Sequence, residues 1–115
     1  MPGTPFSAAA RNQAGGTIID LHGDIDRNAQ EQLEAIYEQT VADGPVILNF
    51  ADVDYINSTG IAVIVGILAR ARAQRRLLRA YGLSDHYREI FHITRLSDFM
   101  GIFDDESAAL ASSPT

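Results

Sequence analysis

Cysteine and lysine are both missing from this chain of 115 residues, and each absence excludes a class of chemistry. Without cysteine the chain has no disulfide, no thiolate nucleophile and no cysteine-bound zinc or iron–sulfur cluster. Without lysine it lacks the phosphate-binding loop Gly-x-x-x-x-Gly-Lys-Ser/Thr. The three histidines, His22, His86 and His92, have no metal-ligand spacing with acidic neighbours. We therefore expect no metal, no cofactor and no catalytic residues, and so a protein that is not an enzyme.

Long hydrophobic runs are missing as well. The longest apolar stretch, Ile61–Ala69, is far shorter than the roughly 20 residues that span a bilayer. The segment Met1–Pro5 has neither the basic nor the apolar part of a secretory signal. We therefore expect a cytoplasmic protein that does not interact with a membrane.

Positive charge is scarce, and the formal net charge is −6. Nucleic-acid binding depends on neutralising phosphates, so an acidic chain argues against it. Five of the nine basic residues nevertheless form a cluster: Arg70, Arg72, Arg75, Arg76 and Arg79. The cluster is typical of a solvated helix end, where cations favour the helix dipole. It also fits a docking patch for an acidic partner.

The residues that are present suffice for one folded domain over 1–115, since 46% of them are hydrophobic. The ends, 1–5 and 112–115, are expected to be frayed. Segments rich in β-branched and apolar residues, bounded by turn residues, predict strands. These segments are Phe6–Gln13, Thr17–His22, Val46–Phe50, Leu77–Tyr81 and Met100–Phe103. For Phe6–Gln13, the run of alanines leaves a poorly ordered tail as the alternative.

Four further segments predict helices, from helical spacing of apolar residues or from a capping residue at their start. They are Asn28–Val41, where Asn28 and Glu31 form a capping box, Ser58–Gln74, Ser84–Ile93 and Asp104–Ala111. Gly23–Asp26 is predicted to break the second strand, and Ala51–Asn57 is predicted to be a loop. Strands that alternate with helices after an initial hairpin predict an α/β sheet with parallel crossovers.

The segment Ile56-Asn57-Ser58-Thr59-Gly60-Ile61 carries the most chemical information. A helix that starts at these polar residues leaves backbone N–H groups unpaired and has partial positive charge at its first turn. A phosphate on Ser58 would gain both, while Gly60 allows another backbone to approach closely. The alternative is that Ser58 simply caps the helix.

The chain resembles the STAS domain family, which contains bacterial anti-sigma-factor antagonists and the cytoplasmic domain of sulfate transporters. Gly23–Asp26 is similar to the family's Gly-acidic-apolar-Asp turn, Val46–Phe50 to its central strand, and Ile56–Ile61 to its Asp-Ser-Ser/Thr-Gly phosphorylation motif. These segments follow in the family's order over nearly the whole chain. The resemblance implies an α/β fold with a mixed sheet of four or five strands packed with about four helices.

By this resemblance Ser58 is the expected phospho-acceptor, and Thr59 is a weaker candidate. The resemblance implies a serine kinase with a histidine-kinase-like ATPase fold that doubles as an anti-sigma factor, and a metal-dependent serine phosphatase that resets Ser58. The unphosphorylated form would bind the kinase, and the kinase would then release the other protein that it holds. Asn57 stands where the family usually has Asp; it caps a helix equally well but removes a negative charge beside the phosphate.

Partner binding is expected at the polar loops and on the outer face of the following helix. The residues predicted to take part are Asp24, Asp26, Asp54, Asn57, Thr59, Gly60, Ala62 and Gly66. On a helical wheel, Ile61, Ile64, Val65, Leu68 and Ala71 cluster on one side, and Ala62, Gly66, Ala69 and Ala73 lie roughly opposite. The small residues would either receive a partner or pack under another helix.

Three other functions compete with the partner-switching one. The chain would be a STAS scaffold or a small-ligand sensor if Ser58 is never phosphorylated. A small enzyme is disfavoured by the missing cysteine, lysine and histidine clusters. A transporter domain is disfavoured by the missing membrane segment.

Overall fold

The computed structural model describes residues 3–40 and 44–111, and within them five strands form one sheet in the order β1-β2-β3-β4-β5. The strands are β1 (Ser7–Gln13), β2 (Gly16–Ile25), β3 (Val46–Ile56), β4 (Leu78–Tyr81) and β5 (Gly101–Phe103). β1 runs antiparallel to β2, and the other neighbours are parallel. The helices are α1 (Gln30–Glu38), α2 (Ser58–Ala73), α3 (Asp85–Ile93) and α4 (Glu106–Ala111), with 3-10 turns η1 (Arg27–Ala29) and η2 (Leu96–Asp98). The predicted α/β fold with a mixed sheet is confirmed.

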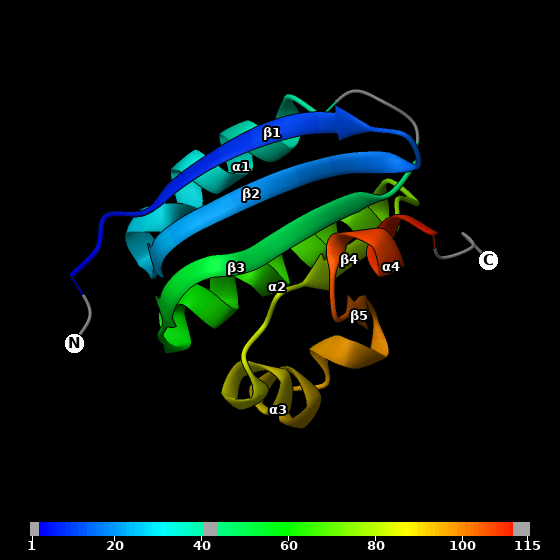
Figure 1. Cartoon of the computed structure of the whole chain (residues 1–115). Coiled ribbons are helices and arrows are strands. Elements are labelled where there is room, and N and C mark those ends of the chain that lie inside the picture. The colour runs from blue at the N-terminus through cyan, green and yellow to red at the C-terminus, as the bar shows by residue number, and fades with distance from the viewer. Residues whose placement is uncertain (1–2, 41–43, 112–115) are drawn as a thin grey trace.

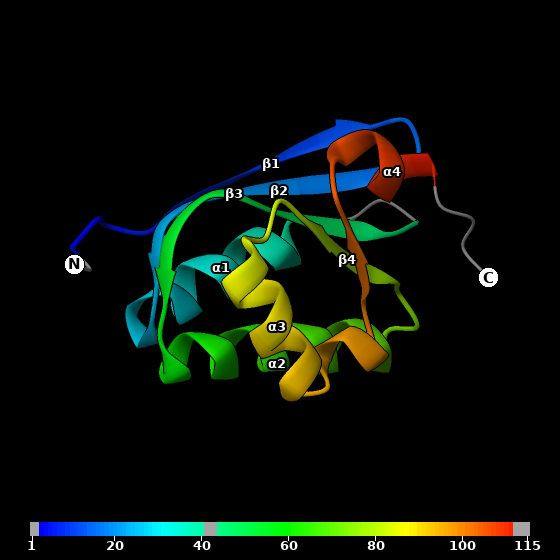
Figure 2. The same ribbon diagram turned by 60° about the horizontal axis from the view of Figure 1, so that its bottom comes forward.

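The two faces of the sheet are covered unequally. α1, α2 and α3 lie on one face and α4 lies on the other, as Figure 1 and Figure 2 show. The larger core lies under the three helices, where Phe91 of α3 packs edge-on against Phe50 of β3 with ring centroids 5.7 Å apart. A smaller core lies under α4, and it consists of Ile18, Ile47, Tyr81 and Ala109. Burial on both faces explains why the start of β3 is a continuous apolar run.

β2 and β3 are both longer than predicted. The predicted break at Gly23–Asp26 is wrong, because β2 continues to Ile25 and absorbs its turn-forming residues in two register shifts, one before His22 and one after Gly23. The predicted loop at Ala51–Asn57 is also wrong, since β3 continues to Ile56 alongside the end of β2. This extension leaves one residue, Asn57, between the end of β3 and Ser58, the first residue of α2.

The start of the first helix differs from the prediction as well. Asn28 is not the cap; Asp26 is, and its carboxylate accepts a hydrogen bond from the Asn28 N–H at 2.8 Å to begin η1. α1 then starts at Gln30 without a side-chain cap. The predicted end of this helix at Val41 lies outside the described residues. The predicted Ser84 cap of α3 is confirmed, because its hydroxyl accepts from the Tyr87 N–H at 3.3 Å.

No helix within 3–40 and 44–111 has the length and apolar character needed to cross a membrane. Gly3 and Thr4 belong to the end that was predicted to be frayed, but both backbone N–H groups donate to the Asp24 carboxylate. Pro5 also lies within the described part, whereas residues 1–2 and 112–115 of the predicted frayed ends lie outside it.

Candidate functional site

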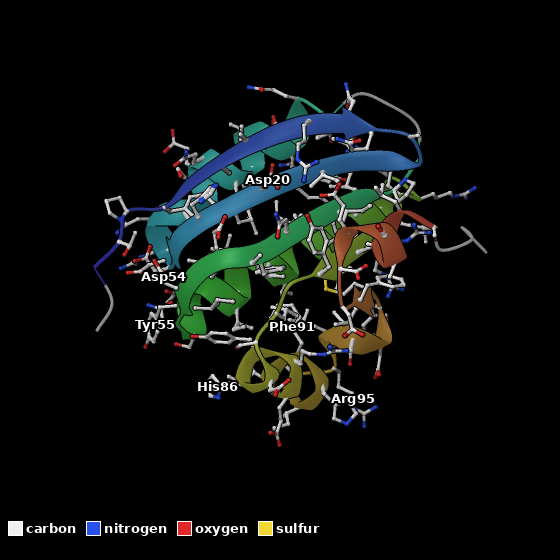
Figure 3. The ribbon with its side chains drawn as sticks, in the orientation of Figure 1. Asp20, Asp54, Tyr55, His86, Phe91 and Arg95 are labelled. Atoms are coloured by element: carbon white, nitrogen blue, oxygen red, sulfur yellow. The ribbon has the colours of Figure 1, made fainter. Side chains whose placement is uncertain are left out.

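The predicted serine segment lies where β3 passes into α2, beside the end of β2. Ile56 of β3 is paired with Ile25 of β2, and the Asn57 N–H donates to the Ile25 carbonyl at 3.3 Å. Figure 3 places Asp54 and Tyr55 at this same end of β3. The carboxyl ends of two parallel strands therefore fix the position at which α2 begins.

Asn57 is the N-cap of α2. Its side-chain oxygen accepts from the Gly60 N–H at 2.8 Å and from the Thr59 hydroxyl at 2.7 Å. Its backbone is extended, with φ −93° and ψ −177°, as a cap requires. The alternative in which Ser58 caps the helix is therefore wrong, because the residue before it performs that role.

Ser58 is the first residue of α2, and it is exposed. Its hydroxyl forms no hydrogen bond with any other described residue, whereas the Thr59 hydroxyl is held by Asn57. The N–H groups of Ser58 and Thr59 have no acceptor within the helix at this position. The site thus presents one unengaged hydroxyl beside the positive end of a helix.

Gly60 is buried, and the close backbone approach predicted for it occurs within the chain itself. A Cβ built at this position would lie 1.9 Å from the Ile25 carbonyl oxygen and 2.7 Å from its carbon. Only a residue without a side chain lets α2 begin this close to the end of β2. Gly60 therefore positions the helix, and its burial removes it from the surface predicted to touch a partner.

The other predicted acidic residues divide between internal and surface roles. Asp24 is only 8% exposed and accepts hydrogen bonds from Gly3 and Thr4, so its carboxylate holds the N-terminal segment instead of facing a partner. Asp26 is half-buried and caps η1. Asp54 is exposed and lines a hollow with Tyr87, whose hydroxyl accepts from the Ile56 N–H at 2.9 Å.

The outer face of α2 borders a groove of about 310 Å³. Thr59, Ala62, Val63 and Gly66 form its α2 side, and Arg27, Gln30 and Glu34 line it from η1 and α1. The small residues do not pack under another helix, because Ala62, Gly66, Ala69 and Ala73 are all exposed. They are therefore available for contact with a partner.

The inward face of α2 is rotated from the prediction. Its buried side chains beyond the first turn are Val63, Ile64, Ile67, Leu68 and Ala71. Val65, predicted to be on the core side, is 46% exposed instead. The difference arises because an almost wholly apolar helix offers several possible inward stripes, and sequence spacing does not choose among them.

The predicted arginine cluster does not form one patch. Arg79 belongs to β4, where it is 4% exposed and donates to the Ala109 carbonyl at 2.8 Å; its burial lowers the pKa of the guanidinium. Arg70 pairs with Glu38 at 2.9 Å. The Arg72 guanidinium stacks over the Phe99 ring, 4.4 Å from its centroid. These arginines mostly tie elements together.

A polar network on the face under α4 was not predicted. Arg11 of β1 pairs with Asp20 of β2 at 2.7 Å and with Glu106 of α4, and the Tyr81 hydroxyl donates to Glu106 at 2.9 Å. The bonds from Arg11 lower the pKa of both carboxyl groups, while burial and the bond to Glu106 raise the pKa of Tyr81. No local pattern could reveal it, because Arg11 and Glu106 are 95 positions apart.

The family model of the STAS domain matches residues 7–109. The anti-sigma-B factor antagonist of Listeria monocytogenes is 37% identical over 86 residues, which are 73% of this chain and 75% of the relative. Among solved structures, an anti-sigma factor antagonist from Mycobacterium paratuberculosis aligns with a TM-score of 0.71 at 19% identity, covering 92% of each chain. The phosphorylated form of SpoIIAA from Bacillus aligns with a TM-score of 0.64 at 22% identity, covering 91% of this chain and 96% of the other.

Proposed function

This chain belongs to the STAS domain family, among relatives of the anti-sigma-factor antagonist type, and we propose that it is a partner-switching regulator controlled by reversible phosphorylation of Ser58. The curated relatives are regulatory proteins, and the chain is accordingly a regulator and not an enzyme. In this proposal its partner is a serine kinase with a histidine-kinase-like ATPase fold that also acts as an anti-sigma factor. A metal-dependent serine phosphatase restores the unmodified serine.

The observation that carries the proposal is the difference between Ser58 and its two neighbours. The Asn57 side-chain oxygen accepts hydrogen bonds from the Thr59 hydroxyl and the Gly60 N–H, whereas the Ser58 hydroxyl is exposed and forms no hydrogen bond with a described residue. Phosphorylating Ser58 therefore breaks no bond that holds the helix start. The phosphate also gains the helix dipole and two N–H donors, so the fold survives the modification.

The proposed switch acts on the surface next to Ser58. The outer face of α2, with Ala62 and Gly66, is smooth and exposed, which suits close contact with a partner. A phosphate adds about −1.5 to −2 charges at neutral pH. Placing that charge within an interface requires desolvation, which is costly without a counter-charge. The unphosphorylated form therefore binds the kinase, and the phosphorylated form releases it.

Asn57 in place of the family's usual Asp is compatible with this role. The capping contact uses one side-chain oxygen, which an amide supplies as well as a carboxylate does. The neutral amide also repels the phosphate less, so the phosphorylated form is less strained. We therefore propose that the exchange keeps the helix start and makes the modified state easier to form.

The test is phosphopeptide mapping of the protein purified from its own cells, with two matched variants. Ser58→Ala should abolish the phosphate, and Thr59→Val, which removes the neighbouring hydroxyl at nearly constant shape, should keep it. Phosphate found on Thr59 alone would identify Thr59, and not Ser58, as the phospho-acceptor. No phosphate in any growth condition would favour the phosphorylation-independent scaffold or ligand sensor.

A further inference from the structure

We propose that the guanidinium of Arg27 forms an ion pair with the phosphate on Ser58, so that the phosphorylated chain carries its own counter-charge. This inference rests on the proposed function, because it assigns a second residue to the same phosphorylation site. Arg27 does not belong to the serine segment, and its position in the fold is what points to it.

Arg27 and Ser58 follow two neighbouring parallel strands at equal distances from their ends. Ile25 of β2 is paired with Ile56 of β3, and each of the two residues is the second after its member of that pair. The strand ends are locked together, since the Asn57 N–H donates to the Ile25 carbonyl. Neighbouring strands lie about 4.8 Å apart, so η1 and α2 start from adjacent points at one edge of the sheet, and the two elements contact each other.

Arg27 also borders the groove that begins beside Ser58, since Thr59, the residue after Ser58, lines that groove. Arg27 lines it from η1, opposite Thr59, Ala62 and Gly66 of α2. Ser58 precedes Ala62 by four residues, which places it one helical turn earlier on the same side of α2. A phosphate on Ser58 therefore stands at the head of a groove that has Arg27 on its opposite side.

Charge favours this pairing. Arg27 is exposed and forms no ion pair with a described residue, whereas Arg11, Arg70, Arg88 and Arg95 each do. Among the described residues that line the groove, Arg27 is the one cation.

The charged groups facing Arg27 are acidic. Glu34 lies in the same groove, Glu31 lies in an adjoining hollow, and Asp26 precedes Arg27 in the chain. Glu34 is already bonded to Gln30 at 3.1 Å, and Asp26 to the Asn28 N–H. A dianionic phosphate offers Arg27 more charge and a bidentate acceptor.

This ion pair would close one end of the groove. When the phosphate bridges from Ser58 to Arg27, the head of the groove is closed and its α2 side is less accessible to a partner. The positive charge of Arg27 also offsets part of the negative charge around the site, which would otherwise repel the phosphate. Phosphorylation then alters the docking surface by occupying it, with no change of fold.

The experiment uses full-length protein in which phosphoserine is installed at position 58 during synthesis, so that no kinase is required. A ³¹P NMR titration measures the second pKa of the phosphate in wild type, Arg27→Gln, Arg27→Lys and Arg72→Gln. Arg72 is the control, because it carries the same charge as Arg27 but lies in α2 about 21 Å from Ser58, at 1.5 Å per residue. That distance exceeds the Debye length of about 8 Å in physiological salt. Circular dichroism confirms that each variant is folded.

A nearby cation favours the dianion, so Arg27→Gln should raise the phosphate pKa by about 0.5 or more. Arg27→Lys should fall between that value and wild type, and Arg72→Gln should match wild type. Equal values in wild type and Arg27→Gln, or an equal change in Arg72→Gln, would overturn the pairing. Either result leaves the proposed function standing, because that is decided separately by whether the cellular protein carries phosphate on Ser58.

Discussion

The two glycines of α2 offer a matched pair of substitutions with opposite expected effects on stability. Gly60→Ala places a methyl group 1.9 Å from the Ile25 carbonyl oxygen, and this neighbour is backbone that cannot rotate away. Gly66→Ala places the same methyl group where no atom lies within 4 Å. Both substitutions exchange the same residues in one helix, so the difference between them isolates the contact with β2.

The magnitudes follow from three contributions. Overpacking costs about 1–3 kcal/mol, and loss of the Asn57 N–H bond to Ile25 as α2 moves away costs about 1 kcal/mol. Alanine is favoured over glycine within a helix by up to about 1 kcal/mol, which partly offsets these costs at position 60. Gly60→Ala should therefore destabilise by about 2 kcal/mol, whereas Gly66→Ala, with the helix preference alone, should stabilise by about 0.5–1 kcal/mol.

Urea unfolding followed by circular dichroism measures both effects. With a slope of about 1–3 kcal/mol per molar urea, Gly60→Ala should lower the midpoint by about 1 M and Gly66→Ala should raise it slightly. If Gly60→Ala proves as stable as Gly66→Ala, α2 does not rest against the end of β2 and the geometry described around Ser58 is incorrect.

Three further outcomes are expected. Asn57→Ala should destabilise by about 1 kcal/mol by removing the cap, whereas Asn57→Asp should stay within about 0.5 kcal/mol of wild type; thermal melts of the pair check this, and equal losses in both would contradict the capping role. Arg11 lowers the folded-state pKa of Asp20 and of Glu106, so its contribution to stability is complete above their unfolded values near pH 4 and is lost as the pH falls through the folded ones. The stability difference between wild type and Arg11→Gln should therefore shrink on acidification from pH 6 to pH 2 in urea titrations, and a constant difference would refute the assignment. Tyr87→Phe removes the acceptor of the Ile56 N–H and should cost about 1 kcal/mol in the same assay, with an unchanged midpoint showing that this bond contributes nothing.

The start of α2 was largely predictable from the sequence. Polar residues at Asn57–Thr59 followed by Gly60 and an apolar run indicate a helix start, and the structure contains one there. The sequence also indicated that Gly60 permits close approach of a backbone. It could not indicate which backbone, because the Ile25 carbonyl comes from a strand whose register is decided by the whole sheet.

The errors at β2 and β3 have one physical cause. Glycine and aspartate in Gly23–Asp26, and the polar residues of Ala51–Asn57, locally favour turns. Pairing between the two long strands overrides that preference, and register shifts accommodate the unfavourable residues. Local propensity is weaker than a paired ladder, so strand ends are where sequence patterns fail first.

The interpretation of the arginine cluster as one docking patch is wrong for a related reason. Closeness in sequence across a helix, a turn and a strand does not place side chains on one surface. Arg79 enters a strand and is buried, while Arg72 remains on a helix and stacks on a ring. Arg27, which stands apart from the cluster in sequence, lies at the candidate site because β2 ends beside β3.

In the proposed switch, phosphate on Ser58 changes partner binding while the fold stays the same. The direct measurement is calorimetric titration of the kinase that modifies Ser58 with the unphosphorylated protein, the Ser58-phosphorylated protein and Ser58→Ala, each shown by circular dichroism to be folded. We predict that the unphosphorylated protein and Ser58→Ala bind alike and that the phosphorylated protein binds at least tenfold more weakly, a loss of about 1.4 kcal/mol or more. Equal affinities for all three would show that phosphorylation of Ser58 does not control binding of the kinase.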